Sequence, residues 1–233
     1  MKKKAFPGLV LLCLTSFLAS HLSQAREPYR PLIDPAKFSS EVSHPWYPLR
    51  PGTVMVYTEK EGDEIRTRTV TVTHDTKLVM GVRCVVVHNV VTGANGHEQE
   101  ETDDCFAQDK EGSVWYFGEA LREFKGHGEV STEGSWEAGT NGQPGIIMPA
   151  HPAPGPAYRQ AYLPNRVEDM GQVIALNETV TVPFGTFSSC VRTKEWSMLE
   201  SGTDMKWYAK GVGLVRAEST GGEVMSLVSV QHH

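Results

Sequence analysis

The chain has 233 residues, of which 21% are charged and 39% hydrophobic, and its formal net charge at pH 7 is −6. This acidic balance disfavours nucleic acid and anionic lipid surfaces as partners, because both require clustered Lys and Arg. The length suffices for one domain with a sizeable core, which is ordinary for an all-β fold.

Residues 1–25 have the features of a secretory signal peptide. Lys2, Lys3 and Lys4 precede an apolar run that ends at the small-residue pattern of residues 23–25. The run is too short and too interrupted to predict a membrane span. We therefore expect an exported bacterial chain that begins at Arg26, is periplasmic or secreted, and has no transmembrane anchor. Loss of the three lysines would bring its net charge to about −9.

Residues 26–52 are rich in proline and predict an extended leader that wraps onto the domain. Trp46 and Tyr47 are the expected anchors of this leader. From Thr53 the apolar residues recur with period two, which is typical of half-buried strands. We therefore expect residues 53–233 to form a single β domain.

Alternation and turn signals divide this domain into short strands at hairpin spacing. The expected strands include residues 53–60, 64–77, 82–91, 102–109, 113–119, 158–162, 171–185, 186–199, 204–211, 213–219 and 223–231. About 10–12 such strands predict an all-β fold, an antiparallel and strongly curved sheet or a barrel or half-barrel, because closure removes exposed edges. A barrel of this strand number can hold a small ligand.

Residues 138–157 interrupt the pattern with many Gly and Pro and no period. A loop of this length is usually functional, so we expect a lid whose apolar residues 146–148 dock onto the sheet.

Large apolar side chains near this loop are candidates for a ligand-binding wall. They are Trp115, Phe117, Trp136 and Met148. Core packing explains most aromatic residues of a β domain, but aromatics beneath a Gly/Pro-rich lid are also how an apolar or amphiphilic ligand is held.

A carboxylate-rich segment, residues 97–109, follows the strand at residues 82–92. If the two pair around the four-residue loop 93–96, His88, Glu101 and Asp103 share one face, and Cys84 stands opposite Cys105. Three interpretations remain open: a solvated surface, a divalent metal site at His88, Glu101 and Asp103, and a Cys84–Cys105 disulfide. Cys190 is another possible partner of Cys84.

Several motifs together resemble an exported bacterial β-rich protein family of uncharacterised function. The motifs are "YPLRPGTVMVY", "AQDKEGSVWYFGE", "GSWEAG", "PGIIMPAHP", "EDM", "VPFGTF" and "YAKGVGLV". The resemblance covers nearly the whole mature chain and implies no activity, cofactor or catalytic residue. Similar sequences have an aromatic residue where Cys105 stands, so a role for Cys105 would be particular to this chain.

The sequence contains no nucleophile elbow, P-loop or dinucleotide fingerprint. Three functions remain: a non-catalytic exported protein that binds a small apolar or amphiphilic molecule in a barrel mouth, an envelope module that binds another protein, and a metal-assisted hydrolase or oxidoreductase. The first agrees best with the expected architecture, although a fold alone does not establish a function.

Overall fold

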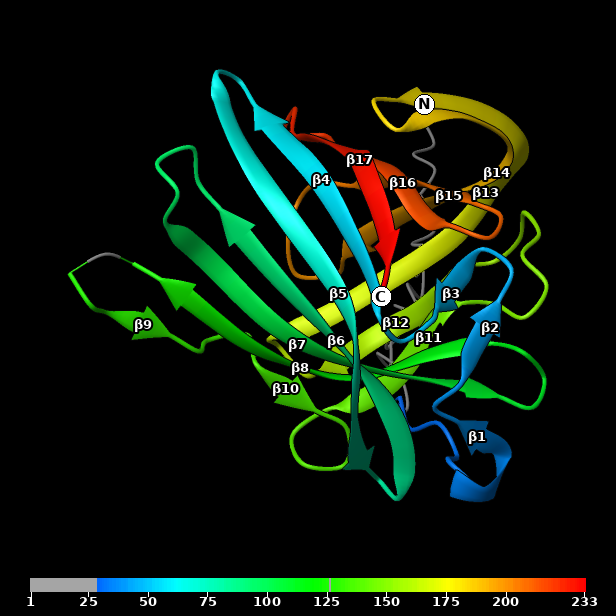
Figure 1. Ribbon diagram of the computed structural model, residues 1–233. Helices are drawn as coiled ribbons and strands as arrows, with labels where there is room; N and C mark the ends of the chain where they lie inside the picture. Colours follow the sequence, from blue (N-terminus) through cyan, green and yellow to red (C-terminus); the bar gives the residue numbers. More distant parts are fainter. Residues whose placement is uncertain (1–28, 126) are drawn as a thin grey trace, which may run out of the picture.

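The computed structural model describes residues 29–125 and 127–233, so the expected signal peptide lies outside the described residues. Within these ranges, twelve antiparallel strands close into a barrel, because β7 pairs with β8 as well as with β6 (Figure 1). The antiparallel all-β fold expected from the sequence is therefore confirmed.

The barrel strands are neighbours in space in the same order as they occur along the chain. They are β4 (Thr53–Glu61), β5 (Glu64–Val79), β6 (Val82–Thr92), β7 (Glu98–Asp109), β8 (Val114–Phe124), β11 (Gln143–Met148), β12 (Tyr158–Leu163), β13 (Val167–Val182), β14 (Gly185–Ser197), β15 (Asp204–Ala209), β16 (Gly213–Ser219) and β17 (Val224–His232), which pairs with β4. Three short strands also pair with barrel strands. Strand β1 (Phe38–Ser39) pairs with β7, and β9 (Val130–Ser131) and β10 (Trp136–Glu137) pair with β8.

Strand β4 shows how alternation builds the interior. Met55, Tyr57 and Glu59 are buried, whereas the residues between them are partly exposed. The first two belong to the main hydrophobic core, and all three line an internal cavity. The inward face of β4 thus has the apolar side chains of Met55 and Tyr57 toward one end and the buried carboxylate of Glu59 toward the other.

The register between β6 and β7 differs from the expected one by two residues. His88 pairs with Asp103 and Val86 with Cys105, whereas the sequence had suggested Cys84 opposite Cys105. The cause is a longer connection, residues 93–97, together with a bulge between Val91 and Thr92. Because the shift is an even number of residues, the predicted faces of both strands are unchanged.

The leader covers one end of the barrel. After the 3₁₀ turn η1 (Pro35–Lys37), β2 (Val42–His44) and β3 (Tyr47–Leu49) form a small hairpin, which lies at the right in Figure 1. The centroid of the Tyr47 ring lies 5.7 Å from that of Phe106 and 5.9 Å from that of Tyr208. The Trp46 indole N–H donates a hydrogen bond to the Ser189 carbonyl oxygen at 3.4 Å. Both expected anchors therefore contact the barrel.

The segment expected to be a lid is in part a barrel strand. Within 138–157, β11 pairs with β8 and β12, residues 138–142 form a turn with an isolated bridge, and residues 149–157 remain a connection without strand structure. Gly145 explains why a Gly/Pro-rich sequence enters the sheet: a Cβ there would lie 2.4 Å from the Arg159 carbonyl oxygen. Close approach of two backbones, rather than loop flexibility, accounts for this glycine.

In the described residues, no helix is long and apolar enough to cross a membrane.

Candidate functional site

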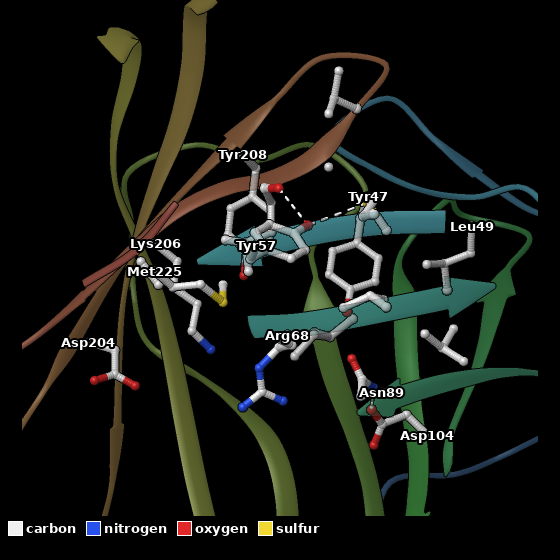
Figure 2. Close-up of a pocket in the computed structure, with 18 of the residues that line it drawn as sticks. Tyr47, Leu49, Tyr57, Arg68, Asn89, Asp104, Asp204, Lys206, Tyr208 and Met225 are labelled. Atoms are coloured by element: carbon white, nitrogen blue, oxygen red, sulfur yellow. Dashed lines mark hydrogen bonds between the residues drawn. The ribbon is translucent and has the colours of Figure 1, made fainter. Parts of the chain in front are cut away.

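The described part of the chain encloses two adjoining cavities inside the barrel. Their volumes are about 390 Å³ and about 500 Å³, and Ile147, Asp204, Lys206 and Ser219 belong to the walls of both. Figure 2 shows the first cavity with its tyrosines at one end and Arg68, Lys206 and Asp204 toward the other. We treat the two as one lumen with a graded lining.

The end next to the leader is apolar. Its wall includes Tyr47, Leu49, Tyr57, Phe106 and Tyr208, most of which are almost fully buried. The Tyr57 hydroxyl donates to the Leu214 carbonyl at 2.9 Å, so the polar tip of this ring is satisfied within the wall. An apolar group packed against Tyr57 therefore leaves this hydroxyl paired.

The opposite end is charged. Glu59 is 3% exposed and accepts a hydrogen bond from Arg68 of β5. Arg68 also contacts Glu100 at 3.4 Å, and Arg66 pairs with Glu223 at 2.6 Å. Four of these side chains are between 24% and 36% exposed, namely Arg66, Arg68, Glu100 and Glu223. This end is therefore the one in contact with solvent.

A second ion pair lies on β14 and β15. Lys206 Nζ donates to Glu195 Oε2 at 2.7 Å, while Thr193 and Tyr208 donate to Glu195 Oε1 at 2.9 and 3.1 Å. Burial alone would raise the pKa of Glu195, but Lys206 and these hydrogen bonds outweigh burial and hold that pKa below its ordinary value. Glu195 is therefore a carboxylate at neutral pH.

Asp104 and Glu119 share the hydroxyl of Tyr116. The hydroxyl oxygen lies 2.6 Å from Asp104 Oδ1 and 3.1 Å from Glu119 Oε2, and Asn89 donates to Asp104 Oδ2 at 2.6 Å. Burial is the largest cause that raises the pKa of Asp104 to about 6 and that of Glu119 to about 7. One hydroxyl proton cannot serve two carboxylates, so a second proton is needed to join all three groups by hydrogen bonds.

A β-bulge creates this arrangement. Phe106 pairs with Tyr116 and Cys105 with Gly118, which leaves Phe117 as the extra residue of β8. Strict alternation would send Tyr116 and Glu119 to opposite faces. The bulge instead places both beside Asp104, a relation for which Gly118 was the available signal in the sequence.

The four candidates for a ligand-binding wall lie in neither cavity wall. Phe117 and Trp136 belong to a second core, in which the leader residue Phe38 packs 5.4 Å from Phe117 and 5.9 Å from Trp115, measured between ring centroids. Met148 is fully buried in the main core. The residues next to them in the chain, Tyr116 and Ile147, line the lumen instead. A contact of the four candidates with a ligand elsewhere stays a prediction.

The metal-site candidates share the outer face of β6 and β7, as predicted. His88 Nδ1 lies 2.8 Å from Asp103 Oδ1, and His88 Nε2 lies 3.7 Å from Glu101 Oε1. Glu101 is also engaged by Arg122. No group of three or more His, Cys, Asp or Glu in the described residues is arranged to hold a metal ion. A divalent cofactor at these residues stays a hypothesis, and Arg122 competes with it for Glu101.

The three described cysteines, Cys84, Cys105 and Cys190, are buried free thiols in this structure. Burial raises the pKa of Cys105 to about 11 and that of Cys84 further. We expect no reaction of the native mature protein with Ellman's reagent, and reaction of all three thiols after unfolding in guanidinium without reductant. A single reactive thiol in the unfolded chain would instead show that two cysteines form the disulfide suggested by the sequence.

Comparisons with known proteins find similarity to solved structures. The chain resembles the crystal structure of a protein from Bacteroides fragilis that was inferred to be exported and has a YmcC-like fold, with 16% identity and a TM-score of 0.49. The match covers 81% of this chain and 99% of that chain. No protein-family model and no curated protein matches the sequence.

Proposed function

We propose that this protein is an exported, non-catalytic binding protein that holds a small amphiphilic molecule in its barrel. The graded lumen is the observation that carries this proposal: the wall changes from Tyr57 and Phe106 near the leader to Glu59, Arg68 and Lys206 near solvent. An apolar tail at the closed end and a polar group at the open end would match this gradient. Both cavity volumes lie in the range of sites for small molecules.

The interior carboxyl pair also raises the question of catalysis, because raised pKa values are common at active sites. Here Asp104 is already saturated: Oδ1 accepts from Tyr116, and Oδ2 accepts from Asn89 and lies 3.3 Å from the Thr102 hydroxyl. Glu119 is in neither cavity wall in the described part of the molecule. Asp104 itself lines the first cavity, but its hydrogen bonds to neighbouring strands favour a role in supporting the barrel wall over proton exchange with a bound molecule.

A large side chain placed in the lumen should weaken the binding of a ligand there. Ala217 lines the first cavity between its pairing partners Lys206 and Met225. We expect Ala217→Trp to weaken binding of the apolar dye N-phenylnaphthylamine at least about tenfold, because the indole occupies the ligand's space. The readout is a fluorescence titration of the mature protein, with native mass spectrometry to detect any molecule that copurifies.

The matched control is Ala120→Trp. Ala120 is exposed on β8 and pairs with Asp103, so the same substitution there adds an indole to the outside of the barrel. Unchanged dye binding in Ala120→Trp with loss in Ala217→Trp supports the proposal. Dye binding that survives Ala217→Trp in a folded protein, judged by circular dichroism, places the dye outside the lumen and contradicts it.

A further inference from the structure

The lining of the lumen carries far more acidic than basic side chains. The acidic residues in the two cavity walls are Glu59, Asp104, Asp169, Glu195, Glu200, Asp204 and Glu223, and the basic residues are Arg68 and Lys206. Such an excess of one sign in a partly enclosed space attracts the opposite charge and raises its local concentration.

The two cations are already committed to carboxylates of the wall. Arg68 pairs with Glu59 and Glu100, and Lys206 pairs with Glu195 at 2.7 Å. In the part of the chain that the structure describes, Asp104, Asp169 and Asp204 have no Lys, Arg or His nitrogen within ion-pair distance. Asp204 is the one of these three that belongs to both cavity walls.

One nearly buried carboxylate of the lining also has an unpaired oxygen. Glu59 Oε2 has no hydrogen-bond partner among the described residues, and Arg66 Nε lies 3.6 Å from it. A buried polar atom without a partner is costly, so it indicates a place for a complementary group. Glu59 Oε2 requires a donor.

We propose that the molecule held in the lumen is a cationic amphiphile, a long-chain amine, whose ammonium group lies between Glu59 and Asp204. Its alkyl chain then runs toward Tyr57 and Phe106 at the closed end. This inference rests on the proposed function, because it names the class of ligand for the same lumen. An ammonium supplies both things that the wall lacks, a positive charge and N–H donors.

The same wall opposes an anionic amphiphile. A fatty-acid carboxylate placed beside Glu59 and Asp204 would meet like charges, and both cations of the wall, Arg68 and Lys206, already pair with Glu59 and Glu195. Juxtaposed like charges disfavour binding of the wrong partner. The lumen therefore selects by repulsion as well as by attraction.

The test compares probes that differ in one property. Decylamine, decanoate and decanol have chains of equal length with positive, negative and neutral head groups, and butylamine keeps the amine with a short chain. We expect decylamine to displace N-phenylnaphthylamine at concentrations at least about tenfold lower than decanoate or butylamine do, at pH 7 and low salt with a chelator present. Added NaCl should weaken decylamine more than decanol, since screening acts on charge alone.

A variant pair connects the preference to the lumen. Asp204→Asn removes one wall charge with little change of shape, and Asp63→Asn removes one charge from the exposed β4–β5 turn. We expect Asp204→Asn to weaken decylamine about tenfold and to leave decanol unchanged, whereas Asp63→Asn changes neither. Equal weakening by both variants would show that only the net charge of the protein matters and would overturn the inference.

The remaining outcomes separate the two proposals. If decanol or decanoate binds the lumen as well as decylamine does, an amphiphile site exists but is not selective for amines, and only the inference about the ligand's charge is overturned. If no probe binds the folded protein, the proposed function itself fails.

Discussion

Replacing Lys206 by methionine is expected to lower the free energy of unfolding by about 3–5 kcal/mol at pH 8. Methionine keeps the length of the side chain but removes the ammonium that lies 2.7 Å from Glu195. Glu195 is 5% exposed, so its carboxylate would be left buried without a cation. The hydrogen bonds from Thr193 and Tyr208 remain, but neither brings a compensating charge.

The loss should depend on pH in a defined direction. In the wild type, the pKa of Glu195 is held below its ordinary value, and the pKa of Lys206 is held above its own because Glu195 outweighs the opposing effect of burial. Without Lys206, burial raises the pKa of Glu195, so this group takes up a proton in the folded state more readily than in the unfolded state. The destabilisation by Lys206→Met should therefore shrink as the pH falls from 8 toward 5.

Urea unfolding at both pH values measures this effect, and two further variants constrain its cause. Adding Glu195→Gln to Lys206→Met should recover much of the loss, because the uncompensated charge is gone. Lys77→Met is the matched control: Lys77 pairs with Glu137 at 2.5 Å, but its side chain is 48% exposed. Exposed pairs contribute roughly 0–1 kcal/mol. A similar loss in Lys77→Met and Lys206→Met would refute the role assigned to burial.

The alternation of apolar and polar residues was enough to predict the fold. In β4, Met55, Tyr57 and Glu59 share the inward face because side chains of a strand alternate, whatever their chemistry. The same rule put His88 and Asp103 on one face of β6 and β7, although their register differs by two residues from the expected one. A register error of an even number of residues leaves each side chain on the predicted face of the sheet but changes its pairing partner. The predicted faces were therefore correct although the predicted pairs were not.

The lumen residues were harder to predict because they depend on exceptions to alternation. The bulge at Phe117 turns Tyr116 and Glu119 to the same side. Large apolar residues such as Phe117 were the expected ligand-binding wall, but Phe117 lies in the second core, where the leader residue Phe38 packs against it. Polar residues of the interior, including Lys206 and Glu195, have no local pattern that separates them from surface charges, since only barrel closure buries them.

Strand β11 was missed for a related reason. Pro144 and Gly145 usually end strands, so the segment was expected to be a loop. The structure uses the absent side chain of Gly145 to bring β11 against the backbone of Arg159 and Gln160. Tertiary contact rather than local preference decides this element.

The second large effect concerns pH and the group formed by Asp104, Tyr116 and Glu119. Burial raises the pKa of Glu119 to about 7 and that of Asp104 to about 6, against ordinary values near 4.5 and 3.8. The folded state therefore binds more protons than the unfolded state between about pH 4 and 7, so stability falls as the pH rises through this window. We expect these two groups to lower the free energy of unfolding by on the order of 1 kcal/mol between pH 6.5 and pH 8.

The charges around the pair do not reverse this direction. Arg68 lowers the pKa of Asp104, but Asp103 raises it, and Glu100 and Asp169 raise that of Glu119. Among other groups, burial lowers the pKa of His44, so His44 acts in the opposite sense below pH 6.5. Measurements from pH 6.5 upward avoid most of that contribution.

Glu119→Gln isolates the effect, because the amide can keep a hydrogen bond with the Tyr116 hydroxyl, which lies 3.1 Å from Glu119 Oε2, but has no charge to bury. This variant should be more stable than the wild type at pH 8, by on the order of 1–2 kcal/mol, and its stability should change less with pH. Glu123→Gln on the same strand, where the side chain is 41% exposed, should behave as the wild type. Chemical denaturation across the pH range gives all three curves, and the contribution of His44 cancels in their differences.

A wild-type stability that rises from pH 6.5 to 8, or a Glu119→Gln curve parallel to that of the wild type, would mean that the pair is ionised in the folded barrel without cost.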